Sequence, residues 1–211
     1  QHEQPQVKSG KLVGTLAFFG AIAGLLIVLA FQWAQPRILA KKAAVLESAV
    51  GEVLGAPARI QSLFLIDGQL LSTPPAGVDT TRVERVFAGY DSDGNTIGYA
   101  VIGAEPGFAD VIQLIFGYDP VKKELLGMKV LDNKETPGLG DKIVKDTAFV
   151  GEFRNAATPL KGVKPGTGKG GTEEIDMITG VTISSRTVIT IINHKLKQVE
   201  PLLVQYAEKQ P

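Results

Sequence analysis

The sequence contains no cysteine among its 211 residues. This absence excludes thiolate-ligated iron–sulfur clusters, attached c-type haem, zinc ribbons, disulfide bonds and a cysteine nucleophile. Only two histidines occur, His2 and His194, and they are too few and too far apart in the sequence to indicate a metal site or a catalytic triad. The 22 basic and 22 acidic side chains leave no net charge, so nucleic acid is not an expected partner. Any redox cofactor of this protein must be held without cysteine.

A stretch of 23 residues without a charge runs from Leu12 to Ala34. As an α-helix it would span roughly 35 Å, which is long enough to cross a bilayer with some tilt. A cleaved signal peptide is the alternative, but the run exceeds the usual apolar core of a signal peptide and no small-x-small cleavage site follows it. We therefore expect an N-terminal tail at 1–11 and a single transmembrane helix at 12–34, surrounded by membrane lipid. Basic residues nearly balance on its two sides, so the positive-inside rule gives no orientation.

Beyond this span the sequence predicts a linking helix at 35–57. Its apolar residues recur every three or four positions, and Gly55 and Pro57 end the pattern. The members of this apolar face are Leu39, Ala43, Leu46, Val50 and Val53. The remaining residues, 58–211, are enough for one domain with a sizeable core.

Within 58–211 the period changes to that of strands. The segments "VERVFAGYD" and "IGYAVIGAE" flank an Asp93-Gly94 turn and predict one hairpin; "VIQLIFGYD" and "ELLGMKVLD" flank "PVKK" and predict a second. A helical period returns from Ile183 to Leu203. Strands grouped between helices indicate an α+β fold: one N-terminal transmembrane helix, then a single domain with a mostly antiparallel sheet and flanking helices.

The glycine-rich segment from Lys161 to Glu174 contains a formal G-x-G-x-x-G. A dinucleotide-binding loop needs a strand before it and a helix that opens at its end, and we expect neither around this segment. It is not a Walker loop either, because Lys169 is followed by glycine rather than serine or threonine. We expect a flexible surface loop here.

Small hydroxyl side chains gather in "TGVTISS", Thr179 to Ser185, just before the last predicted helix. The first amides of a helix have no internal partner and point along the positive end of its dipole, so a phosphate group is well placed there. Gly180 permits a positive φ, and Ser184 or Ser185 would cap the helix or donate to phosphate oxygens. Capping alone also accounts for these hydroxyls. The residues by themselves leave both interpretations open.

The segment resembles the S/T-G-A-T-x-S/T-S motif of the FMN-binding domain family. That family includes the G subunit of Rnf-type ferredoxin–NAD oxidoreductase complexes and the B and C subunits of sodium-translocating NADH–quinone reductase. The resemblance implies that a flavin transferase esterifies FMN phosphate onto the hydroxyl of Thr182, which makes the chain a phosphoprotein with covalent flavin. The sequence departs from the motif at Val181, where the family usually has alanine.

A second segment, "NKETPGLGDKI" from Asn133 to Ile143, is similar to the E-T-P-G-L-G loop of the same family. A Pro-Gly turn alone would also explain it. In the family this loop lies beside the flavin. The resemblance implies hydrogen bonds to the flavin from Glu135 and Thr136, with Leu139 beside the ring and the backbone amides of Gly138 and Gly140 in reach of the ring or ribityl chain.

The resemblance covers nearly the whole chain and implies a membrane-anchored electron carrier. It would be one redox subunit of an ion-translocating Rnf-type complex and would not be catalytic alone. Its partners would be the integral membrane and iron–sulfur or flavin subunits of that complex. The chain would be anchored in the bacterial inner membrane, with its domain on the periplasmic or extracellular side. The C subunit of the sodium-translocating reductase is the second possibility. A membrane regulator or organic-acid reductase module with the same domain, and a tethered binding domain without flavin, are the others.

Overall fold

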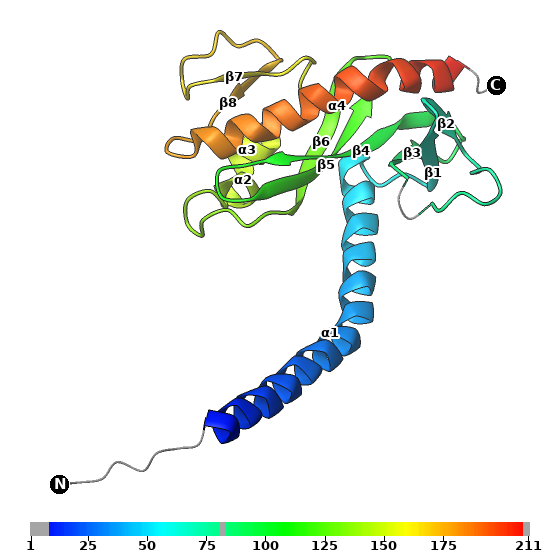
Figure 1. The fold of residues 1–211 in the computed structure, drawn as a ribbon. Coiled ribbons are helices and arrows are strands. Elements are labelled where there is room, and N and C mark those ends of the chain that lie inside the picture. Colours follow the sequence, from blue (N-terminus) through cyan, green and yellow to red (C-terminus); the bar gives the residue numbers. More distant parts are fainter. Residues whose placement is uncertain (1–8, 81–82, 209–211) are drawn as a thin grey trace. The chain divides into compact units, whose positions relative to one another are not determined.

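The computed structural model describes residues 9–80 and 83–208 (Figure 1). Most of the expected tail, with His2 and Lys8, lies outside the described residues. The chain divides into two compact units, Gln1–Val45 and Leu46–Pro211. The second unit holds the whole sheet, so the site is built within it.

The first element is one helix, α1 (Ser9–Val53), that continues through Pro36. The expected span at 12–34 and residues 35–53 of the expected linking helix are therefore consecutive parts of a single helix, whereas 54–57, expected as its end, are not helical. Proline removes one backbone hydrogen bond, which membrane helices tolerate where neighbouring groups adjust. Among the described residues, α1 is the one helix long and apolar enough to cross a membrane, and none of its most apolar window is buried. The expected single N-terminal apolar helix is confirmed.

A six-stranded sheet follows, in the order β2-β1-β3-β4-β5-β6, and each neighbouring pair is antiparallel. Both expected hairpins are present, as β3–β4 and β5–β6. In the first, Gly94 has a φ of +88° and the Asp91 side chain accepts from the amides of Asp93 and Asn95, which fixes the turn. The strands are β1 (Arg59–Ile66), β2 (Gln69–Leu71), β3 (Arg85–Tyr90), β4 (Thr96–Pro106), β5 (Val111–Asp119) and β6 (Glu124–Asp132).

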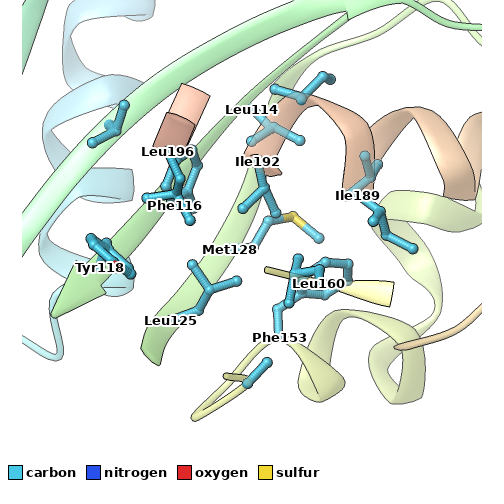
Figure 2. Packing of buried hydrophobic residues seen from close by; sticks show 14 of the residues in the cluster. Leu114, Phe116, Tyr118, Leu125, Met128, Phe153, Leu160, Ile189, Ile192 and Leu196 are labelled. Carbon is cyan, nitrogen blue, oxygen red and sulfur yellow. The ribbon is translucent and has the colours of Figure 1, made fainter. Parts of the chain in front are cut away.

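The last helix, α4 (Thr182–Glu208), lies across one face of the sheet (Figure 1). Its apolar face buries Ile189, Ile192 and Leu196 against side chains of β5 and β6, as Figure 2 shows. Polar contacts add to this packing: the Tyr118 hydroxyl donates to Glu200 Oε1 at 2.9 Å, and the Lys195 ammonium pairs with Glu84 at 2.9 Å. The helix is thereby fixed along its length, including the end that carries Thr182.

The C-terminal turns of α1 pack on the opposite face of the sheet. The apolar face predicted for the linking helix is buried only at its end, by Ala49, Val50 and Val53 together with Leu54. These side chains contact Phe87, Ala100 and Ile115, which alternate along β3, β4 and β5 with the residues that face α4. Leu39, by contrast, is exposed. The sheet is thus covered on both faces by helices of its own chain.

Between β6 and α4 the chain forms two short helices and a two-stranded parallel pair. Helices α2 (Lys142–Lys145) and α3 (Thr147–Glu152) are joined by Asp146, whose side chain accepts from the amides of Ala148 and Phe149. Strands β7 (Lys161–Val163) and β8 (Glu174–Asp176) flank the glycine-rich segment. The expectation of a loop without a preceding strand is wrong, because both ends of the segment pair with each other. No helix opens at the end of its glycines, so the dinucleotide interpretation still fails.

Two buried tyrosines under α4 are expected to make the folded domain less stable at alkaline pH. Burial raises the pKa of Tyr99 to about 12, and burial together with the nearby Glu200 carboxylate raises the pKa of Tyr118 to about 12. The unfolded chain releases these protons near pH 10, so between pH 10 and 12 it binds fewer protons than the folded chain. Stability is therefore expected to fall as pH rises through this window, by up to about 1.4 kcal/mol per pH unit for each tyrosine.

Thermal unfolding followed by circular dichroism from pH 9 to 12 measures this slope. The Tyr99→Phe form is the informative comparison, because the Tyr99 hydroxyl is buried without a hydrogen-bond partner among the described residues. Its unfolding temperature should match the wild type at pH 9 and decline less steeply above pH 10. Equal slopes for the two proteins would contradict the expectation.

Candidate functional site

The N-terminus of α4 has unpaired backbone amides. Gly180 adopts a φ of +80°, the Val181 amide closes the preceding turn on the Ile178 carbonyl at 3.0 Å, and the first helical bond runs from the Ser185 amide to the Val181 carbonyl. Within the described chain, no acceptor bonds the amides of Thr182, Ile183 and Ser184. These three amides stand at the positive end of a 27-residue helix, which is the arrangement that anions favour.

The three hydroxyls from Thr182 onward have different environments. Thr182 is exposed, and its hydroxyl has no hydrogen-bond partner in the described part of the chain. Ser184 is 2% exposed and donates to Glu135 Oε2 at 2.7 Å. Ser185 is fully buried and donates to the Val181 carbonyl at 2.9 Å. Only the Thr182 hydroxyl is both accessible and unengaged.

The expectation that Ser184 or Ser185 caps the helix is wrong. The helix begins at Thr182, so both serines lie inside its first turn rather than before it. Gly180, which has a positive φ, ends the preceding turn. A capping serine would stand just before the first residue of the helix, whereas the helix already begins at Thr182. The Ser184 hydroxyl instead bonds to Glu135, and the Ser185 hydroxyl bonds to the turn before the helix. Within the described residues, neither serine hydroxyl is free to donate to a phosphate.

The E-T-P-G-L-G loop forms a tight turn. The Leu139 amide donates to the Thr136 carbonyl at 3.1 Å, and Gly138 has a φ of +78° as the third residue of a type II turn. The Gly138 amide donates to Asp141 Oδ1 at 2.8 Å. The hydrogen bond from Lys145 holds the pKa of the Asp141 carboxyl below its ordinary value. The conformation of Gly138 is therefore required by the turn itself.

The two motifs, distant in sequence, form one pocket of about 280 Å³. The E-T-P-G-L-G loop supplies one wall and the start of α4 supplies the other. The pocket brings together eight of the eleven residues expected at the site, namely Glu135, Thr136, Leu139, Gly140, Gly180, Val181, Thr182 and Ser184. Gly138 and Ser185 belong to the same two segments but do not line the pocket. Thr179 lines a neighbouring cavity with Lys142 and Lys145 of α2 instead.

Two further residues complete the pocket: Phe108 and Ile183. Phe108 lies in the turn between β4 and β5 and is 65% exposed, and Ile183 is 53% exposed. The sequence marks Phe108 only as an aromatic residue in a turn, where apolar side chains are unusual. Phe108 is held at the pocket by a hydrogen bond from its amide to Glu135, which lies 27 residues later in the sequence. The rim of the pocket is thus largely apolar.

Glu135 is buried at the base of the pocket, 5% exposed. Its Oε1 accepts from the amides of Phe108 at 2.9 Å and Ala109 at 3.1 Å, while its Oε2 accepts from Ser184. A Cβ on Gly140 would lie 2.6 Å from Glu135 Oε2, so this glycine is needed for close packing rather than for backbone approach to a ligand. Glu135 therefore joins all three segments of the pocket.

Comparison with a protein-family model indicates the class of domain. Residues 107–197 match the model of the FMN-binding domain family, a range that contains both motifs and every residue of the pocket. The expected resemblance to this family is confirmed by the match over residues 107–197. The chain thus combines one long apolar helix, α1, with a region similar to FMN-binding domains.

Individual curated relatives indicate a narrower class of similar proteins. The chain is 28% identical over 192 residues to the G subunit of the ion-translocating oxidoreductase complex of Methanosarcina acetivorans, which covers 90% of this chain and 93% of the relative. It is 35% identical over 114 residues to the G subunit of the Na(+)-translocating ferredoxin:NAD(+) oxidoreductase complex of Acetobacterium woodii, covering 53% of each. Several relatives are thus matched over only about half of their length.

A solved structure supports the fold independently. The crystal structure of Shewanella oneidensis NqrC superposes with a TM-score of 0.66 and 18% identity, covering 81% of this chain and 100% of that one. At this identity the likeness shows the fold alone. The expected α+β domain with a mostly antiparallel sheet is confirmed.

Proposed function

We propose that this chain is the membrane-anchored electron carrier of an Rnf-type ion-translocating ferredoxin–NAD oxidoreductase complex, with FMN joined to Thr182 by a phosphoester. Its relatives are named as the G subunits of such complexes, and its pocket lies within the FMN-binding domain. The chain acts as one redox subunit and does not turn over an organic substrate alone.

The observation that carries the proposal is the state of the hydroxyls at the pocket. An acceptor of FMN phosphate needs a hydroxyl that a transferase can reach and that no other group occupies. Ser184 and Ser185 are buried and engaged, and Thr179 lines another cavity. Thr136 and Thr182 are both exposed, unengaged and at the pocket, but only Thr182 stands at the free amides of the α4 N-terminus, where a phosphate group is stabilised.

The residues present fit a flavin phosphodiester. A diester carries one negative charge, which the free amides of Thr182, Ile183 and Ser184 stabilise without a cluster of basic side chains. The apolar side chains of Phe108, Leu139 and Val181 suit the edges of an aromatic ring system. The volume of about 280 Å³ is at the low end for a cofactor site, so part of the flavin would remain accessible to a redox partner.

The flavin, when bound, supplies the transfer of one or two electrons. The chain binds and orients it through the α4 N-terminus, the turn at Gly138 and the rim at Phe108. Glu135 is the one ionisable side chain that lines the described pocket, so the pocket holds no acid–base pair for chemistry on an organic substrate. This composition favours an electron relay.

The partners implied are the integral membrane and iron–sulfur or flavin subunits of the complex, and a flavin transferase during maturation. We place the domain outside the cytoplasm, anchored by α1 as a single span. The C subunit of a sodium-translocating NADH–quinone reductase is the alternative. Purification of the chain from its native membrane distinguishes the two, because an Rnf complex would retain ferredoxin-type iron–sulfur subunits and NAD reduction by ferredoxin.

Covalent flavin is tested on the full-length protein produced with and without its flavin transferase. We expect the band on a denaturing gel to fluoresce under ultraviolet light only with the transferase, and the intact mass to rise by one FMN less one water. A dark band and an unchanged mass with an active transferase would overturn the proposal.

A further inference from the structure

Glu135 is a buried carboxylate in the wall of the pocket, and both of its oxygens accept hydrogen bonds. An ionised carboxylate has acceptors only, and the three donors around it, two backbone amides and the Ser184 hydroxyl, match this pattern. The resemblance of its loop to a flavin-binding motif suggested that Glu135 would bond to the flavin. In the structure three hydrogen bonds to its two oxygens come from the protein instead.

All three donors are uncharged. None of the lysine, arginine and histidine side chains in the described residues forms an ion pair with Glu135. The nearest basic residue along the chain, Lys134, pairs with exposed Asp110 at 2.9 Å. The hydrogen bond to Lys134 lowers the pKa of Asp110 from its ordinary value. The negative charge of Asp110 is thus balanced in solvent, whereas that of Glu135 is buried without a counter-ion.

A buried charge acts strongly on what occupies the same pocket, because water does not screen it there. Reduction of a flavin adds electrons, and the reduced ring carries negative charge at neutral pH. A fixed negative charge beside it raises the free energy of the reduced form more than that of the oxidised form. The reduction potential of the flavin therefore falls.

We propose that Glu135 tunes the flavin of this pocket to a low reduction potential by placing an uncompensated negative charge in the pocket wall, while its hydrogen bonds hold the wall in position. This inference rests on the proposed function, since it concerns the same flavin. A low potential suits a carrier that must accept electrons from a strongly reducing donor and pass them on with little loss.

The test uses full-length protein carrying its covalent flavin, and spectroelectrochemical titration measures the midpoint potential. Glu135→Gln keeps the size of the side chain and an oxygen acceptor but removes the charge, so we expect the potential to shift to a more positive value. Asp110→Asn is the matched control, because it also removes one negative charge but from an exposed, paired residue of the neighbouring turn. We expect no shift for it.

Ser184→Ala separates charge from structure. It removes one hydrogen bond to Glu135 and leaves the carboxylate charge in place, so the potential should stay the same or become more negative. An upward shift in Ser184→Ala as large as that in Glu135→Gln would overturn the inference, as would a Glu135→Gln potential equal to the wild type. A wild-type protein without covalent flavin would instead refute the proposed function, so the two failures are distinct.

Discussion

Thr182→Val is expected to abolish covalent flavin, with gel fluorescence falling to the background of protein made without the transferase. Valine matches threonine in shape but lacks the hydroxyl that forms the ester. The neighbouring serines cannot replace it, because Ser184 is held by Glu135 and Ser185 by the Val181 carbonyl, and both are buried. The loss should therefore be complete. The fold should persist, because Thr182 is exposed and makes no hydrogen bond in the described chain.

Two controls sharpen this result. Thr190→Val makes the same exchange two turns further along α4, away from the pocket lining, and should retain full fluorescence. Thr182→Ser keeps a hydroxyl at the acceptor position and should retain a covalent label. Mass spectrometry of the tryptic peptide 170–186, which contains every hydroxyl of the motif, then locates the flavin directly. A label on Ser184, or fluorescence in Thr182→Val, would contradict the assignment.

The architecture of the sheet could be predicted from the sequence because its determinants are local. Alternation of apolar residues gives a strand, and a turn residue such as Gly94 joins two strands to a hairpin. Each determinant acts over a few residues, so the sequence displays it directly. The two hairpins predicted the pairs β3–β4 and β5–β6, while the pairing of β4 with β5 is seen only in the structure.

The limits of α1 and α4 were predicted less well, because tertiary context overrules local preference. The sequence predicted a membrane span at 12–34 and a separate linking helix from 35, yet α1 runs through both. Serine is a common capping residue, yet the start of α4 is set by Gly180 and leaves both serines inside the helix.

The candidate site likewise has one part that the sequence predicts and one part that it does not. Its anion-binding end was predictable, because the amides of a helix N-terminus follow from the helix alone. The role of Glu135 was not, since its partner Ser184 lies 49 residues away and its partner Phe108 lies 27 residues away. Only the folded chain brings a buried acceptor to these donors. Hence the resemblance placed Glu135 in hydrogen bonds to the ligand, whereas in the structure Glu135 lines the pocket and its oxygens accept from the protein.

The attachment of α1 to the sheet leads to the second large effect, on stability. Gly117 of β5 lies directly beneath the last turn of α1, and a Cβ at this position would collide with the Val53 carbonyl oxygen and approach Leu126 Cβ at 3.1 Å. A backbone carbonyl cannot move as a flexible side chain can, so the helix end must shift. We expect Gly117→Ala to destabilise the folded domain by about 1–3 kcal/mol, the usual cost of overpacking.

Gly127 provides a matched control, because it pairs directly with Gly117 in the β5–β6 ladder and also faces Val53. A Cβ there would lie 3.8 Å from the Val53 Cα, which is ordinary van der Waals contact. Gly127→Ala should therefore leave stability within about 0.5 kcal/mol of the wild type. In thermal unfolding of the detergent-solubilised chain, Gly117→Ala should lower Tm by about 2–4 °C for each kcal/mol lost. Equal Tm values for the two variants would mean that the end of α1 does not rest on the glycines of the sheet, because that contact is the difference between them.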